Sequence, residues 1–170
     1  MRTVPPDKVT DRAIALSKDY PNKKLIIHYL QRHYPFLGKV GKEFHEKHGY
    51  TSQSDNWNIW TKLRAGEHDE AEVWEAYKEN LRVTLPEVEC LINNIQGKIV
   101  ITSDHGNAFG EHGVYGHPRY VHIPALTDVP WFILPYENRR KIKSSETTET
   151  FEGAADDDVK EKLRDLDYVE

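Results

Sequence analysis

Residues 69–95 carry a long helical repeat, which is the feature that most directly constrains the fold. Asp69 and Glu72 have the spacing of a capping box and predict a helix that starts here. Pro86 is expected to kink this helix or to split it in two, and Gly97 follows as a stop signal. The apolar residues that recur every three or four positions, and so form the predicted stripe, are Trp74, Tyr77, Leu81, Leu85, Val88, Ile92 and Ile95.

Short apolar runs on both sides of this helix predict strands. Residues 25–30 (LIIHYL) and 98–102 (KIVIT) have the length and β-branched content of buried strands, and residues 129–134 (VPWFIL) predict another. A strand, a helix and a strand in this order imply a parallel pair joined by a right-handed crossover. The expected fold is therefore α/β, with a mostly parallel sheet flanked by helices.

The remaining segments complete the expected organisation. The first twenty residues predict another helix. Residues 31–66 are rich in aromatic and basic side chains without a sustained period, and we expect a long irregular segment, which in compact domains is typically functional or lid-like. Residues 1–136 are expected to form one domain. Residues 137–170 are expected to form a charged tail that ends in a short helix capped by Asp158.

Composition excludes several classes of protein. The net charge of −5 argues against nucleic-acid binding, which requires a basic patch. The single cysteine, Cys90, excludes a disulfide framework and a cysteine-based zinc cluster. No apolar run approaches the roughly 18 residues that a membrane span requires, and the N-terminus has no signal-peptide pattern. We therefore expect a cytoplasmic protein without a membrane span.

The most informative segment follows the predicted strand 98–102 and reads TSDHGNAFGEHGVYGHP over residues 102–118. In open α/β sheets, ligands bind beyond the carboxyl ends of the strands, where Asp104 and His105 stand. A carboxylate oxygen beside an imidazole nitrogen suits one divalent cation. The glycines of the segment allow the backbone to fold back and bring His112 and His117 towards that point. The alternative interpretation is an ordinary turn in which the aspartate caps a helix.

These motifs resemble a known family. TSDHGNAFGEHGVYGH resembles the C-terminal signature of the sulfatase-like branch of the alkaline phosphatase superfamily. HYLQRHYPF at residues 28–36 resembles the strand end that carries an active-site histidine there, and VHIPALTDVPWFIL at residues 121–134 resembles the strand after the signature. The resemblance implies an alkaline phosphatase/sulfatase-like α/β domain, of which this chain is the C-terminal half.

The resemblance assigns roles to four residues. Asp104 and His105 match the pair that ligates the catalytic divalent metal, which could be Ca²⁺, Mg²⁺, Mn²⁺ or Zn²⁺. His117 matches a residue that touches the oxygens of the ester, and His33 matches a histidine that protonates the leaving group. These roles suit a small-molecule or glycan sulfate or phosphate ester, which needs a Lewis acid on its non-bridging oxygens and a proton at its departing oxygen.

Two parts of the family's pattern have no counterpart in this sequence. The family carries its nucleophile (Cys, Ser or Thr) and its first metal-binding aspartate on an N-terminal segment, and nothing similar precedes residue 24. Cys90 lies on the predicted helical stripe and is expected to pack in the core. We therefore expect little or no activity from this chain alone, with an N-terminal half or a partner chain supplying the rest.

Three functions stay open at this point. The first is a sulfatase-like ester hydrolase. The second is a phosphodiesterase, phosphonate monoester hydrolase or phosphoglycerol-type transferase of the same superfamily. The third is a non-catalytic remnant or partner subunit. Among the other candidate residues, we expect His28 to be a core histidine, His112 to orient the loop, and Trp60 to pin the irregular segment to the core.

Overall fold

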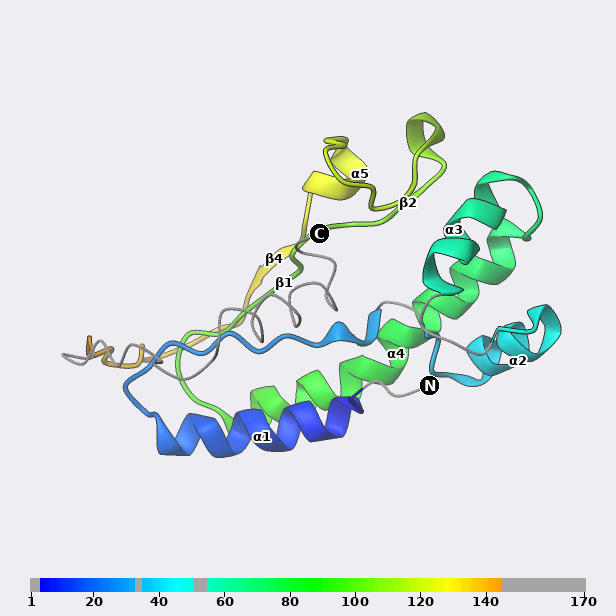
Figure 1. Cartoon of the computed structure of the whole chain (residues 1–170). Helices are drawn as coiled ribbons and strands as arrows, with labels where there is room; N and C mark the ends of the chain where they lie inside the picture. The colour runs from blue at the N-terminus through cyan, green and yellow to red at the C-terminus, as the bar shows by residue number, and fades with distance from the viewer. Residues whose placement is uncertain (1–3, 33–34, 51–54, 145–170) are drawn as a thin grey trace, which may run out of the picture.

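A computed structural model of the chain describes residues 4–32, 35–50 and 55–144 (Figure 1). Its longest element is helix α4, Glu70–Asn94, against which α1 and α2 pack. Asp69 caps this helix, because its Oδ1 accepts hydrogen bonds from the backbone N–H of Ala71 at 2.8 Å and of Glu72 at 3.1 Å. The predicted long helix and its start are therefore confirmed. Pro86 lies inside α4, which continues past it as one element.

Helix α1, Pro6–Asp19, lies along the C-terminal half of α4 (Figure 1). Small side chains line this contact: Thr10, Ala13 and Ser17 are buried, and the Thr10 hydroxyl donates to the carbonyl oxygen of Glu87 at 3.3 Å. Arg140 adds a link from the far end of the chain, since its guanidinium donates to Ser17 and to the Gln96 carbonyl. The predicted first helix is thus confirmed.

Two helices occupy much of the segment that the sequence analysis expects to be irregular, so that prediction is wrong. Helix α2 spans Lys39–His48 and helix α3 spans Asp55–Arg64. Two of the glycines that suggest irregular structure stand at the ends of α2, and a third, Gly41, is buried inside it. Gly38 is its N-cap, and Gly49 ends it with φ of 69°, a left-handed conformation that glycine adopts without strain. The two helices form the main core with α4, with its fully buried members Phe44, Ile59, Val73 and Ala76.

Two polar side chains of α4 brace the start of α2. The Glu79 carboxylate accepts hydrogen bonds from the backbone N–H of Lys39 at 2.9 Å and of Gly41 at 3.1 Å. The fully buried Asn80 accepts from the Leu37 N–H at 2.6 Å and donates to the Pro35 carbonyl. Residues 35–41 are therefore held on α4 by hydrogen bonds between their backbone N–H and C=O groups and these two side chains.

The strands pair antiparallel, in two small sheets. Strand β1, Val100–Thr102, pairs with β4, Trp131–Ile133, in the register Val100↔Ile133, and β2, Ala108–Phe109, pairs with β3, Tyr115–Gly116. The short helix α5, Pro124–Thr127, precedes β4.

The expected alkaline phosphatase/sulfatase-like α/β fold with a mostly parallel sheet is therefore wrong for the described residues. The physical reason lies in residues 25–30. They form no strand, and the 3-10 turn η1, Leu30–Arg32, follows directly. Without a first strand, α4 does not act as a crossover. The chain instead returns from β1 to β4 through a loop, a hairpin and one short helix, which yields an antiparallel pair.

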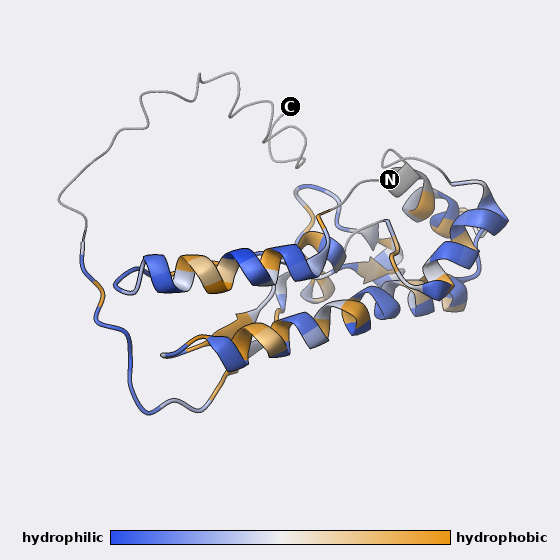
Figure 2. Cartoon of the chain, turned by 90° about the horizontal axis from the view of Figure 1, so that it is seen from below, coloured by the Kyte–Doolittle hydropathy of each residue, from blue (hydrophilic) through white to orange (hydrophobic). Residues whose placement is uncertain are grey.

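Polar and apolar residues alternate along the two helices α1 and α4 that lie side by side in Figure 2. Among the helices of residues 4–32, 35–50 and 55–144, none combines the length with the apolar composition that crossing a membrane requires. Of the predicted tail, residues 137–144 have no regular secondary structure, and the helix expected after Asp158 lies outside the described residues.

Candidate functional site

The residues of the DHG motif stand in a loop, here called the DHG loop, that spans residues 103–118 and begins where β1 ends. Its first glycine is held against α5, because the Gly106 N–H donates to the Leu126 carbonyl at 2.9 Å. A Cβ at Gly106 would lie 2.0 Å from the backbone oxygen of Ala125. The motif therefore needs glycine at this position because another backbone segment passes too close for any side chain.

Asp104 and His105 form the centre of the site. The Asp104 Oδ1 accepts from the His105 N–H at 3.1 Å, and its Oδ2 lies 3.8 Å from His105 Nε2. His105 Nδ1 donates to the Gly106 carbonyl at 2.8 Å, which keeps a proton on Nδ1 and makes Nε2 the nitrogen that can bind a cation. Both side chains are partly exposed, so a ligand can reach them.

His28 is the residue that sequence reasoning missed at this site. Its Nε2 lies 3.6 Å from Asp104 Oδ2, and half of its side chain is exposed. The expectation that His28 packs in the core is therefore wrong. Its position in an apolar alternation indicates a strand with a buried face, whereas residues 25–29 have no regular secondary structure and belong to neither sheet.

The charges around Asp104 favour its ionised form. Burial alone would raise the pKa of this carboxyl. The positive charge of His105, the backbone N–H groups of Asp104 and His105, and the charge of His28 outweigh burial and hold the pKa of Asp104 below its ordinary value. Asp104 is therefore a carboxylate at neutral pH, as cation binding requires.

His117 returns to the same place from the far end of the DHG loop. Its ring stacks on that of His105, with 4.5 Å between the ring centroids and an interplanar angle of 28°. Its Nδ1 lies 2.6 Å from the side-chain oxygen of Asn107, whose amide nitrogen donates to the Tyr77 hydroxyl at 3.1 Å. The DHG loop therefore folds back and brings His117 against His105, as the sequence predicts for His117.

Aromatic contacts anchor the β2–β3 hairpin of this loop to the helices. The Phe109 ring lies 5.1 Å from that of Trp60 on α3 and 4.8 Å from that of Trp74 on α4, both edge to face. Gly116, with φ of 71°, sits against the Trp60 ring, where an added Cβ would come within 3.0 Å. Trp60 is buried in the core as expected, but its own segment is helix α3 and not an irregular loop. The loop that it contacts is the DHG loop, which carries His117.

The other sequence candidates take different places. His33 lies outside the described residues. His112 is exposed with φ of 53°, and Glu111 accepts a hydrogen bond from the Phe109 N–H at 2.6 Å, so both belong to the turn of the hairpin. Cys90 is exposed on α4, which contradicts its expected packing in the core.

The donor chemistry of Asp104 and His105 fits a divalent cation. Two ligand atoms that share a tetrahedral metal with bonds of about 2.0–2.2 Å lie roughly 3.3–3.6 Å apart. The His28 and His105 Nε2 atoms that face Asp104 Oδ2 lie 3.6 and 3.8 Å from it, at and slightly beyond the upper end of this range. Within the part of the chain that the structure describes, no group of three or more His, Cys, Asp or Glu side chains is arranged to hold a metal ion. Among the described residues, Asp104 and His105 are therefore a pair of possible donors and not a complete metal site.

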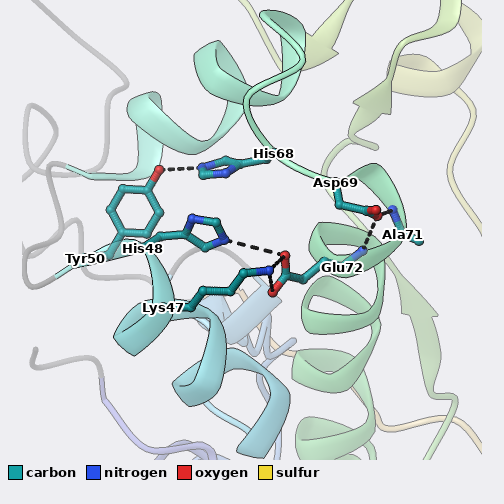
Figure 3. A network of polar contacts seen from close by, with 7 residues as sticks. All are labelled: Lys47, His48, Tyr50, His68, Asp69, Ala71 and Glu72. Carbon is teal, nitrogen blue, oxygen red and sulfur yellow. Dashed lines mark hydrogen bonds and ion pairs between the residues drawn. The ribbon is translucent and has the colours of Figure 1, made fainter.

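A second group of histidines joins α2 to the start of α4 (Figure 3). Lys47 Nζ and His48 Nε2 contact the Glu72 carboxylate at 2.8 and 3.5 Å, and Tyr50 bonds to the buried His68 at 2.6 Å. Burial, followed by the charges of nearby His48 and Lys62, lowers the pKa of His68. Because Glu72 binds to α2, it does not act as the second half of a capping box, and we regard this cluster as a structural link between the helices.

Comparison with known proteins adds no relative. No family model matches the chain, and no curated protein and no solved structure matches it either.

Proposed function

We propose that this chain is a metal-dependent hydrolase domain of the sulfatase-like class that acts on sulfate or phosphate esters. The observation that carries the proposal is the convergence of Asp104, His105 and His117 after β1, with His28 against the same carboxylate. A carboxylate and imidazoles in one partly exposed place combine the ligands that divalent cations prefer with groups that exchange protons near neutral pH.

Each residue has a distinct part in this proposal. A bound divalent cation would supply positive charge to the non-bridging oxygens of the ester. Asp104 Oδ2 and His105 Nε2 are the atoms that would hold it. His117, stacked on His105, would face a bound ester and contact one of its oxygens, and the sequence resemblance assigns His33 to the departing oxygen.

Phosphodiesters and phosphonate monoesters are the alternative substrates, because they present the same kind of oxygens to the same cation. A specific observation favours a second candidate, a non-catalytic domain that binds a metal ion. Asp104 and His105 are two ligands, whereas catalytic zinc sites have three protein ligands. Turnover separates this candidate from the first.

The test measures cation binding first and ester turnover second. Isothermal titration of the purified chain with Mn²⁺ and Zn²⁺ should show binding that Asp104→Asn weakens at least about tenfold, because even the loss of an outer-shell partner typically costs 10–100-fold. Aryl sulfate, aryl phosphate and bis-aryl phosphodiester substrates are then assayed with each metal. Because the sequence has no counterpart of the family's nucleophile, we expect little or no turnover from this chain alone, and any turnover that does occur should require metal and fall in Asp104→Asn.

Asp128→Asn is the matched control, because Asp128 is an exposed aspartate directly after α5 and makes none of the contacts of Asp104 with histidine. It should leave cation affinity and turnover unchanged. Equal cation affinity in the wild type and in Asp104→Asn would reject the site. Cation binding at Asp104 with no turnover of any ester would reject a hydrolase formed by this chain alone. Metal-dependent turnover would instead reject the non-catalytic candidate.

A further inference from the structure

Asn107 and Tyr77 connect His117 to helix α4. The Asn107 side-chain oxygen lies 2.6 Å from His117 Nδ1, and its amide nitrogen lies 3.1 Å from the Tyr77 hydroxyl oxygen. The three side chains are partly buried and come from two parts of the chain, thirty positions apart for Asn107 and Tyr77. Nothing in the sequence motif indicates this link, since Tyr77 belongs to the helical repeat of α4.

The chemistry of the groups sets the direction of each hydrogen bond. An amide oxygen only accepts, so His117 must donate from a protonated Nδ1. The amide nitrogen only donates, so the Tyr77 oxygen accepts its bond. Rotating the amide by half a turn would put the amide nitrogen against His117 and the amide oxygen against Tyr77, and it would require the opposite histidine tautomer. The assignment is therefore testable through the position of one proton.

The surroundings hold both ends of this link in place. The Tyr77 ring stacks on that of Trp74, with 6.0 Å between centroids, and meets the Phe109 ring edge to face at 5.4 Å. The His117 ring stacks on that of His105. Asn107 thus bonds to the Tyr77 and His117 side chains, whose rings other contacts already orient. These two bonds limit the rotation of the Asn107 amide.

We propose that Asn107 and Tyr77 are positioning residues that hold His117 as the Nδ1–H tautomer and direct its Nε2 towards a bound ester. The role of His117 towards an ester rests on the proposed function, whereas the tautomer does not. An amide suits this task for an anionic substrate, because it fixes the proton on Nδ1 without adding a negative charge that would repel a sulfate or phosphate group.

The test reads the tautomer directly, in the metal-free full-length chain labelled with ¹⁵N. Long-range ¹H–¹⁵N correlation spectra, recorded well above the ordinary histidine pKa of about 6.5, should show His117 mainly as the Nδ1–H form. In Asn107→Leu, which keeps a similar shape without the amide, the ratio of the two tautomers should shift about tenfold towards Nε2–H, the effect of losing one hydrogen bond. Tyr77→Phe should shift it in the same direction by less.

Two further variants separate positioning from general structural damage. Asn107→Asp retains an acceptor and should keep the Nδ1–H form. Asn94→Leu removes an exposed amide that bonds to the Cys90 carbonyl and should change nothing at His117. If Asn107→Leu fails to fold, Tyr77→Phe carries the test, because it leaves every ring in place. An Nε2–H form of His117 in the wild type, or an unchanged ratio in both variants, would overturn the proposal. A chain that binds no metal yet shows these tautomers would reject only the proposed function.

Discussion

The helical cluster of α2, α3 and α4 and the two-stranded sheet of β1 and β4 treat their apolar residues in opposite ways. In the cluster, Phe44 and Val73 are completely buried. In the sheet, Trp131 and Phe132 are 68% and 58% exposed, although they belong to the apolar run VPWFIL that predicts a buried strand. A two-stranded sheet has too few neighbours to cover both of its faces, whereas three helices enclose a common core.

The candidate site lies between these two regions, and the difference in burial determines how each supports it. The DHG loop starts at the exposed sheet, and its hairpin returns to the helices through Phe109 and Trp60. Most of the apolar burial that stabilises the fold therefore lies in the helical cluster. The β1–β4 sheet positions the start of the DHG loop but contributes less to stability. Regions with few buried apolar contacts open at lower free energy, so we expect the site to be adjustable without global unfolding.

The strongest way to break this comparison is to truncate one aromatic ring in each region. Phe44→Ala should lower the free energy of unfolding by about 3–5 kcal/mol, because it leaves a cavity in a fully buried core. Phe132→Ala should lower it by about 0.5 kcal/mol or less, because its ring is already mostly in water. Urea unfolding followed by circular dichroism measures both values.

Similar losses from the two truncations would mean that the sheet is covered in solution as well as the helices are. Ile133→Ala, on the same strand and 42% exposed, serves as a check on the Phe132 result. The two strand variants should agree.

The second test concerns the junction between the regions. Gly106→Ala should cost about 1–3 kcal/mol and displace the DHG loop from α5, because the new methyl group meets the Ala125 carbonyl. Gly113→Ala provides the matched control in the same loop. Its φ is 74° with open space around it, so only the left-handed backbone penalty of about 1–2 kcal/mol applies.

The two glycine variants should differ most at the site itself. The ring signals of His105 and His117 in nuclear magnetic resonance spectra should move in Gly106→Ala and stay in place in Gly113→Ala. Unchanged signals in both variants would show that the contact with α5 does not position the DHG loop.

Part of this architecture could be predicted from the sequence, because local signals determine it. The cap at Asp69 and the helical repeat define α4 from neighbouring residues alone. The face that α4 buries was not predictable in the same way. Trp74 and Leu85 of the predicted stripe are 42% and 48% exposed, while Asn80 is fully buried. Its amide satisfies backbone groups of a segment more than forty positions away, which no periodicity reveals.

In the candidate site too, contacts between residues close in the sequence were predictable and contacts between distant residues were not. The proximity of Asp104 and His105 follows from their adjacency, and the return of His117 follows from the glycines between them. His28 could not be found by the same reasoning, since its contact with Asp104 joins residues 76 positions apart in the sequence. The wrong expectation of a parallel sheet has a related cause: the apolar composition of residues 25–30 favours a strand, but strand pairing depends on partners distant in the sequence.

The smallest expected effect concerns the ion pairs between α2 and α4. It compares their contribution to the free energy of unfolding with that of the apolar core of the helical cluster. Glu72 joins α4 to Lys47 and His48 of α2 (Figure 3). Burial would raise the pKa of Glu72, but the hydrogen bonds and charges of Lys47 and His48 outweigh it, and the pKa lies below its ordinary value. A lowered carboxyl pKa stabilises the folded state above the ordinary pKa of 4.5, and this stabilisation is lost as the pH falls through the folded-state pKa.

Glu72→Gln should therefore lower the free energy of unfolding by less than about 1 kcal/mol at neutral pH, because a partly exposed ion pair contributes little. The difference from the wild type should vanish as the pH falls below the ordinary carboxyl range, since the wild-type side chain is then also neutral. Urea unfolding at a series of pH values measures it, with Glu89→Gln, an exposed position on the same helix, as the control. A loss as large as that of Phe44→Ala, or one that persists in acid, would mean that the polar link and not the apolar core holds α2 against α4.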